Sequence, residues 1–136
     1  MLKLKDKFFR GYVSSRPING NTIPQSLQNL KIRDYAISKN IHFKLSITEY
    51  RMKKTYFALN SLKKEIGKLG GVIFFSIYQL PEEKITRRQF LNFFIKSNKK
   101  LFFALEDIEV KNKFEIEEID LIYFISKNSH KAFNYE

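Results

Sequence analysis

Short apolar stretches alternate along the chain with segments in which apolar positions recur every three or four residues. Short stretches rich in Phe, Ile and Val predict β-strands, and the three-to-four spacing predicts amphipathic helices. The pattern predicts strands over residues 8–14, 42–47, 72–77 and 100–105, helices over 25–39, 55–68, about 84–97 and 113–127, and a loose tail from Asn128.

Two of these segments indicate the fold class. Residues 72–77 form a short apolar run bounded by glycines and a turn, which is typical of a central strand buried on both faces. The helix over 55–68 ends at Gly70-Gly71 and carries one apolar stripe. Strands that alternate with helices indicate a parallel sheet. We therefore expect a single α/β domain, a small three-layer α/β/α sandwich whose four strands lie in the order 2-1-3-4.

Polar residues gather where each predicted strand ends. In open parallel sheets, ligands bind beyond the carboxyl ends of the strands, near the point where the strand order reverses. Arg16 also lies close to the start of two predicted helices, whose free N–H groups favour anions, so we expect an anionic ligand. The candidate ligand-binding residues at this edge are Ser14, Arg16, Asn19, Asn21, Gln25, Gln28, Asn29, Thr48, Tyr50, Ser76 and Gln79. The plainer interpretation is that these are ordinary polar loop residues.

Arg87 is a further candidate for binding the ligand. It shares a helical stripe with Phe90, Leu91 and Phe94, at steps of three, four and seven residues. An arginine on the inward stripe of a first helical turn is expected to point towards the same sheet edge.

The first predicted helix has apolar residues on two stripes. Asp34 lies on the stripe of Leu27, Leu30 and Ile37, where an unpaired carboxylate is costly, so we expect an ion pair or a subunit contact there. A homodimer would cover the helix on its second side. The second stripe is formed by Ile32, Tyr35 and Ala36.

Candidates for catalysis are few. Glu49 and Glu106 follow two of the strands and are candidates for a general acid and base, and Ser14 or Ser15 for a nucleophile that needs a base nearby. The sequence has no Gly-rich phosphate loop, no cysteine, and in His42 and His130 no pattern typical of metal ligands. We therefore expect neither a metal nor a bound cofactor.

Composition limits the class of protein. At 136 residues with 43% hydrophobic residues, the chain is large enough for one core, and it has no apolar run of the length that spans a bilayer. Without a recognisable signal peptide, we expect a cytoplasmic protein. The net charge of +11 raises the question of nucleic acid. Because the lysines are scattered in ones and twos, we favour a solvated basic surface over a dedicated face for polyanions.

Six short strings occur in the order found in one bacterial family. They are Gly11-Tyr-Val-Ser-Ser-Arg-Pro17, Asn19-Gly-Asn21, Pro24-Gln-Ser-Leu-Gln-Asn29, Ile32-Arg-Asp-Tyr35, Thr48-Glu-Tyr50 and Tyr78-Gln-Leu-Pro81. From about residue 10 to 125 the chain resembles the sporadic carbohydrate cluster proteins, which are encoded among genes for surface-polysaccharide synthesis. The resemblance implies a role in making an O-antigen or capsule sugar, and it implies no particular reaction.

The chain also resembles the catalytic domain of serine recombinases (resolvases) at the level of the fold. The resemblance lies in Gly11-Tyr12 on the first strand, Gln25-Ser-Leu-Gln28 opening a helix, and the turn Tyr78-Gln-Leu80. It implies a flavodoxin-like α/β fold. Aligned on Gly11-Tyr12, Ser14 stands in place of the recombinase arginine and Arg16 in place of its nucleophilic serine. We therefore expect a shared fold without strand transfer.

Three functions follow as hypotheses. The first is a small enzyme, or a catalytic partner of one, that acts on a phosphorylated or nucleotide-activated sugar. Arg16 and Arg87 would hold the anion, and Glu49 or Glu106 would move a proton. The second is a non-catalytic sugar-binding or scaffolding subunit that works with a partner enzyme. The third, which we disfavour, is a recombinase-like nucleic-acid binder.

Overall fold

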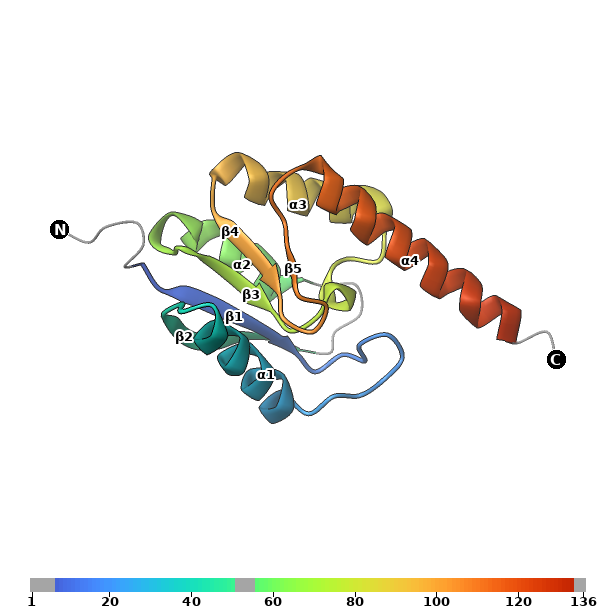
Figure 1. The fold of residues 1–136 in the computed structure, drawn as a ribbon, viewed down its shortest axis with the longest axis horizontal. Coiled ribbons are helices and arrows are strands. Elements are labelled where there is room, and N and C mark those ends of the chain that lie inside the picture. Colours follow the sequence, from blue (N-terminus) through green and yellow to red (C-terminus); the bar gives the residue numbers. More distant parts are fainter. Residues whose placement is uncertain (1–6, 51–55, 134–136) are drawn as a thin grey trace.

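The computed structural model describes residues 7–50 and 56–133, with side chains as far as Asn128. Strands and helices alternate through most of this length, as Figure 1 shows. The strands are β1 (Phe9–Ser14), β2 (Phe43–Glu49), β3 (Gly71–Phe74), β4 (Lys100–Phe103) and β5 (Ile108–Glu109). The helices are α1 (Gln25–Ser38), α2 (Phe57–Glu65), α3 (Lys84–Ser97) and α4 (Lys113–Phe133), with 3₁₀ turns at Ile66–Lys68 and Ile77–Gln79.

The strands form one sheet in the order β2-β1-β3-β4-β5. The first four strands are parallel and lie in the predicted order, whereas β5 pairs antiparallel with β4 and was not predicted. The predicted strand 100–105 ends early because the chain reverses after Phe103, with Asp107 in the left-handed region at φ 53°. Two residues are too few to produce a strand pattern in the sequence, which explains the missing fifth strand.

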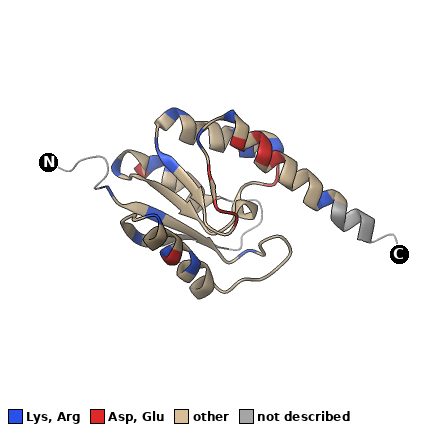
Figure 2. Ribbon diagram, viewed as in Figure 1, with Lys and Arg blue, Asp and Glu red and all other residues tan. Residues whose placement is uncertain are grey.

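Helices cover both faces of this sheet. Phe74 and Phe103 pack with residues of α2, α3 and α4, whereas Ile73 and Phe102 pack with residues of α1. Neighbouring residues of a strand point to opposite faces, so β3 and β4 serve both cores. The predicted three-layer α/β/α sandwich is therefore confirmed. Most charged residues lie on the helices and turns rather than along the strands (Figure 2).

The orientation of α1 differs from the expectation for Asp34. Gln28, Ile32, Tyr35 and Ala36 are the buried residues of α1. Asp34 and its stripe instead face solvent, with exposed fractions of 53% for Leu27, 60% for Leu30 and 70% for Ile37. The prediction of an ion pair for Asp34 was wrong within the described residues, because an exposed carboxylate is solvated, whereas a subunit contact on this stripe stays a prediction. Periodicity alone does not decide which of two apolar stripes packs on the sheet.

Several element ends also differ. The predicted start of the second helix at residue 55 lies outside the described residues. The third strand stops at Phe74 rather than residue 77, since Ser76 and Gln79 form a capping box for the following 3₁₀ turn. Helix α4 continues to Phe133, so the prediction of a loose tail from Asn128 was wrong for residues 128–133. No Pro or Gly interrupts that stretch, and helix extension is cooperative.

The described helices include none that is long and apolar enough to cross a bilayer.

Candidate functional site

The strand order reverses between β1 and β3, and the polar residues that follow these strands meet at that point. The Ser14 N–H donates to Gln28 Oε1 at 2.9 Å, and Gln28 Nε2 donates back to the Ser14 carbonyl at 2.8 Å. Gln79 Nε2 donates to Ser14 Oγ and to Gln28 Oε1, each at 3.0 Å. All three residues are buried. These amides therefore join the ends of β1 and β3 to each other.

Glu106 closes the same edge beyond β4. Ser76 Oγ donates to Glu106 Oε2 at 2.6 Å, and the Ile77 N–H donates to Oε1 at 2.9 Å. Burial raises the pKa of Glu106, and the hydrogen bonds from Ser76 and Ile77 pull it partly back. The carboxyl group thus links the end of β4 to the turn after β3.

Glu49, at the end of β2, is 2% exposed and accepts hydrogen bonds on both oxygens. The donors are the Tyr12 hydroxyl at 3.0 Å and the N–H groups of Ala58 at 2.9 Å and Leu59 at 3.2 Å. These two N–H groups belong to the first turn of α2, so Glu49 occupies the anion position at that helix start. Burial raises the pKa of Tyr12, and the Glu49 carboxylate raises it further.

Arg16 lies on the outer side of Glu49. Its guanidinium is 3.8 Å from Glu49 Oε1 and 4.3 Å from the centre of the Tyr56 ring. The anion beside Arg16 in this structure is therefore a carboxylate of the chain itself. Arg16 retains a partly exposed side chain, with 23% of its surface accessible.

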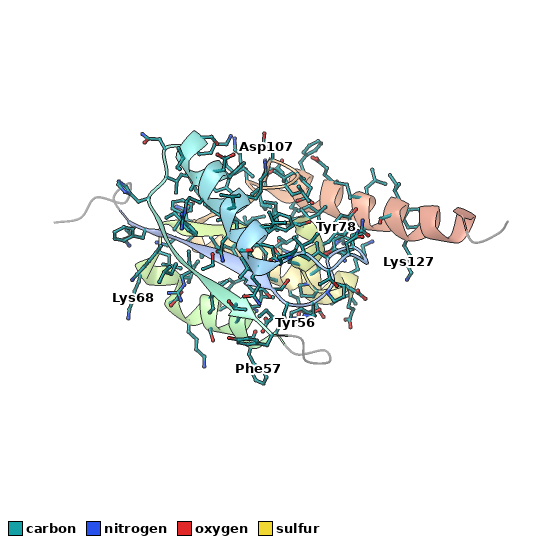
Figure 3. The ribbon with its side chains drawn as sticks, turned by 90° about the horizontal axis from the view of Figure 1, so that it is seen from below. Tyr56, Phe57, Lys68, Tyr78, Asp107 and Lys127 are labelled. Carbon is teal, nitrogen blue, oxygen red and sulfur yellow. The ribbon has the colours of Figure 1, made fainter. Side chains whose placement is uncertain are left out.

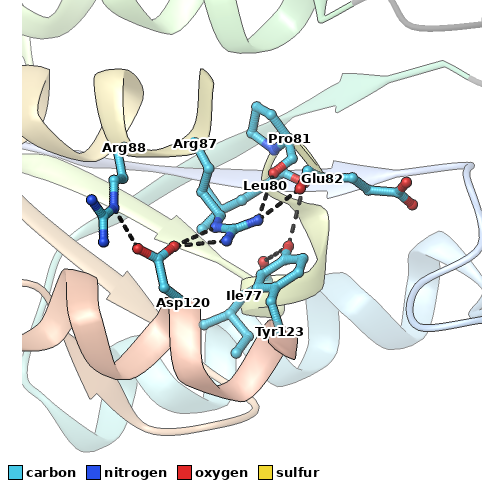
Figure 4. A network of polar contacts seen from close by, with 8 residues as sticks. All are labelled: Ile77, Leu80, Pro81, Glu82, Arg87, Arg88, Asp120 and Tyr123. Atoms are coloured by element: carbon cyan, nitrogen blue, oxygen red, sulfur yellow. Dashed lines mark hydrogen bonds and ion pairs between the residues drawn. The ribbon is translucent and has the colours of Figure 1, made fainter. Parts of the chain in front are cut away.

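Arg87 ties α3 to α4 (Figure 4). Its Nε and Nη2 donate to Asp120 Oδ1 at 3.0 and 2.7 Å, and Nη1 donates to the Glu82 carbonyl at 2.9 Å. Arg88 binds the other oxygen of Asp120 at 2.6 Å. The Arg87 guanidinium also lies 3.9 Å from the centre of the Tyr123 ring. The expected inward position of Arg87 is observed, and nearly all its donors serve internal contacts.

A cleft of about 730 Å³ opens between the loop after β1, the start of α3, and α4. It lies at the end of the molecule that carries Tyr78 and Lys127 in Figure 3. Among the lining residues described, four cations face two carboxylates, and three aromatic rings form part of the wall. The cations are Arg16, Lys84, Arg87 and Lys127, the carboxylates Glu82 and Asp120, and the rings Tyr78, Tyr123 and Phe124.

The predicted ligand-binding residues divide between the cleft and its surroundings. Arg16, Asn19 and Arg87 line the cleft, and Asn19 Oδ1 accepts a hydrogen bond from Ser126 of α4 at 3.2 Å. Thr48, Glu49 and Tyr50 instead line a smaller hollow of about 270 Å³ beside the end of β2.

The remaining predicted residues lie in neither hollow. Asn29 Oδ1 accepts from Ser46 Oγ at 2.5 Å, Asn21 Nδ2 donates to the Asn19 carbonyl, and Ser15 Oγ is 3.5 Å from the Glu49 carbonyl. Gln25 is half-buried at the first turn of α1.

The sequence did not point to Lys84, Lys127 or the aromatic wall. The usable signal was on α4, where Asp120 follows Ile116 by four residues and precedes Tyr123 by three, which places all three on one helical face. The sequence did not show that Arg87 of α3 packs on this face of α4.

The arrangement suits binding more than proton transfer. Glu49 and Glu106 are both held by hydrogen bonds outside the cleft. Within the described part of the chain, Ser15 has no histidine or carboxylate side chain among its hydrogen-bond partners. Among the described residues, no group of three or more His, Asp and Glu is arranged to hold a metal ion. His42 lies at the opposite edge against Phe8, and the side chain of His130 lies outside those described.

No family model matches the sequence, and no curated protein matches it either. The likeness to the sporadic carbohydrate cluster proteins therefore finds no support in these comparisons. Among solved structures, the chain is similar to the N-terminal catalytic domain of TP901-1 integrase, with a TM-score of 0.61 and 14% sequence identity. The match covers 90% of this chain and 98% of that domain. The expected fold-level likeness to the serine recombinase catalytic domain is thus confirmed, and it concerns the fold alone.

Proposed function

We propose that this chain is a binding subunit for a phosphorylated or nucleotide-activated sugar, serving the synthesis of a surface polysaccharide. The observation that carries the proposal is the combination of cationic and aromatic side chains in one cleft at the carboxyl edge of a parallel sheet. Clefts at this position are the usual ligand sites of such folds, and about 300–1,000 Å³ is the usual volume.

The chemistry of the lining favours this class of ligand. Lys84 and Lys127 supply ammonium groups that bind phosphate oxygens as point charges. Phe124 exposes 65% of its surface, and Tyr78 and Tyr123 lie in ring contact at 5.3 Å between centroids. Aromatic rings of this kind stack on the apolar face of a sugar or on a base. The two sets of contacts together select a ligand with both a phosphate and a ring.

A binding subunit is favoured over an enzyme by the position of the candidate acids. Glu49 accepts three hydrogen bonds inside the fold and Glu106 two, and neither carboxylate lines the cleft, so neither is placed to act as general acid or base on a ligand bound there. A partner enzyme from the same pathway would then supply the reaction.

The test is isothermal titration calorimetry with UDP-glucose, glucose 1-phosphate and uncharged glucose. We expect binding of the two phosphate-bearing ligands and weak or no binding of glucose. Lys84→Ala and Lys127→Ala should each weaken binding by roughly tenfold, since one charge-assisted hydrogen bond is lost. Lys31→Ala, on the outer surface of α1, is the matched control and should leave binding unchanged. Equal effects of all three substitutions would place the ligand elsewhere.

A recombinase-like nucleic-acid binder is the second candidate. It is favoured by the similarity to an integrase catalytic domain and by the net charge of +11. Such binding falls steeply with added salt, because neutralised phosphates release counterions. Binding of a short DNA duplex that weakens by orders of magnitude between low and physiological salt would support it.

A further inference from the structure

The edge of the sheet opposite the cleft gathers lysines that are far apart in the sequence. The pairing register aligns Phe9 of β1 with Gly71 of β3, and Gly71 with Lys100 of β4. Lys7 Nζ donates to the Gly67 carbonyl at 3.1 Å, and Gly67 precedes Lys68 in the 3₁₀ turn that follows α2. Lys7, Lys68, Lys99 and Lys100 therefore form one group, called the lysine edge below.

The lysine edge is separate from the proposed sugar site. The strands run from it towards the cleft, and Figure 3 shows Lys68 at the opposite end of the molecule from Tyr78 and Lys127. Figure 2 likewise shows Lys and Arg at the end from which β1, β3 and β4 start.

Two members of the lysine edge repel each other. Lys7 and Lys99 interact directly, and loss of solvation together with the Lys7 charge lowers the pKa of Lys99. None of the ion pairs found among the described residues includes a lysine of this edge. The nearby Glu65 is engaged by Arg10 at 3.6 Å. Within the described part of the chain, folding thus gathers these charges without supplying their counter-ions.

Helix stabilisation accounts for only part of this arrangement. Lysines near a helix C-terminus interact favourably with the helix dipole, which applies to Lys68 in the turn that ends α2. Lys7 donates to the Gly67 carbonyl in that same turn, and Lys99 follows Asn98, which caps the C-terminus of α3, so helix ends favour these two charges as well. Lys100 lies on β4. The exposed ammonium groups of Lys68 and Lys100 remain accessible to an external anion.

We propose that the lysine edge docks on an anionic membrane surface. Lysine-rich faces are attracted to anionic headgroups, with each lysine strengthening binding roughly fivefold, whereas nucleic-acid sites favour the forked contacts of arginine. The lysine edge contains no arginine. Phe8 follows Lys7 in the sequence and is 48% exposed, with its ring against His42 at the start of β2, so an exposed aromatic side chain borders the lysine edge.

The test is co-sedimentation of the full chain with vesicles of phosphatidylcholine, with and without phosphatidylglycerol. Binding is expected only with phosphatidylglycerol. The double variant Lys68→Glu, Lys100→Glu removes two exposed cations and should weaken binding at least about 25-fold. The control variant Lys31→Glu, Arg33→Glu makes the same change in net charge on α1 and should weaken it by less than about threefold. Thermal melting checks that both variants fold.

Three results would overturn the proposal. One is an equal loss in the two double variants, which would show attraction by net charge alone. Another is the absence of binding to phosphatidylglycerol vesicles by the unaltered chain. The third is tighter binding of a short DNA duplex than of vesicles, abolished by Lys68→Glu, Lys100→Glu, which would make nucleic acid the occupant. Sugar-phosphate binding in the cleft is independent of all three.

Discussion

At the end of β4, the carboxyl group of Glu106 lies between the Ser76 hydroxyl and the Ile77 N–H, and burial raises its pKa. The folded state therefore binds the proton more tightly than the unfolded chain, whose glutamates have an ordinary pKa of 4.5. The resulting stabilisation is fully present below that pKa and is lost as the pH rises through the folded pKa.

Glu106→Gln tests this effect, because glutamine keeps the shape of the side chain but does not titrate. The free energy of unfolding of the unaltered chain, measured relative to this variant, should decrease as the pH rises above the ordinary pKa of 4.5 and through the raised pKa of Glu106. Urea denaturation at several pH values measures the difference. A difference that stays constant, or that grows with pH, would contradict the raised pKa.

For single residues, the sequence predicted where the polar groups lie but not what they bind. The positions of Ser14, Gln28, Gln79 and Glu106 at one edge follow from the strand order. Whether such groups bind a ligand or one another depends on distances that only the packed structure supplies. A buried amide such as Gln28 uses its hydrogen-bonding capacity wherever partners lie within reach, here on the backbone of β1 and on Gln79.

Among the elements, α3 and α4 are held together by Arg87 and Asp120, which are 3% and 8% exposed. Arg87→Ala leaves a buried carboxylate with one fewer partner and should lower the free energy of unfolding by about 3–5 kcal/mol. Arg88 binds the same carboxylate from the surface, at 44% exposure. Arg88→Ala is therefore the matched control and should cost less than about 1 kcal/mol. Chemical denaturation measures both changes in the free energy of unfolding. Similar decreases for Arg87→Ala and Arg88→Ala would contradict the expected difference between the two arginines.

Elements with strong patterns were predicted well, and those set by local geometry were not. The apolar run over 72–77 indicated a central strand, and β3 lies between β1 and β4. The end of β3 depends on the capping box at Ser76, and β5 depends on a turn at Asp107, neither of which changes the hydrophobic period. The sequence predicted helix α1 but not its orientation, which depends on which of its two apolar stripes packs against the sheet.

For the whole molecule, the exposed stripe of α1 supports the prediction of a homodimer through this helix. Leu27, Leu30 and Ile37 are more than half exposed over three turns, and a second copy is the occupant we predict. Sedimentation velocity at micromolar concentration should show a dimer that Leu30→Asp converts to a monomer. Leu121→Asp, at an exposed apolar position of α4, is the control. A dimer that Leu121→Asp dissociates and Leu30→Asp does not would show that the interface lies on α4 rather than on α1.

Charge is also organised at this scale. The sequence shows scattered lysines, but the parallel sheet brings several of them to the edge where strands begin, while the cleft lies where β1 and β3 end. The membrane docking and the ligand binding proposed above use opposite ends of one small domain. The sequence does not show this separation of the lysines from the cleft, because it depends on the register in which the strands pair.

The central claim is that the cleft binds a phosphate-bearing sugar, and a thermal-shift titration tests it most directly. The protein would be melted with nucleotide sugars, sugar phosphates and a short DNA duplex, at low and at high salt. A ligand that binds the folded state raises the melting temperature with dose. We predict a rise with one class of sugar phosphate that persists at high salt and is reduced by Lys84→Ala. A rise with DNA alone that vanishes at high salt would contradict the account.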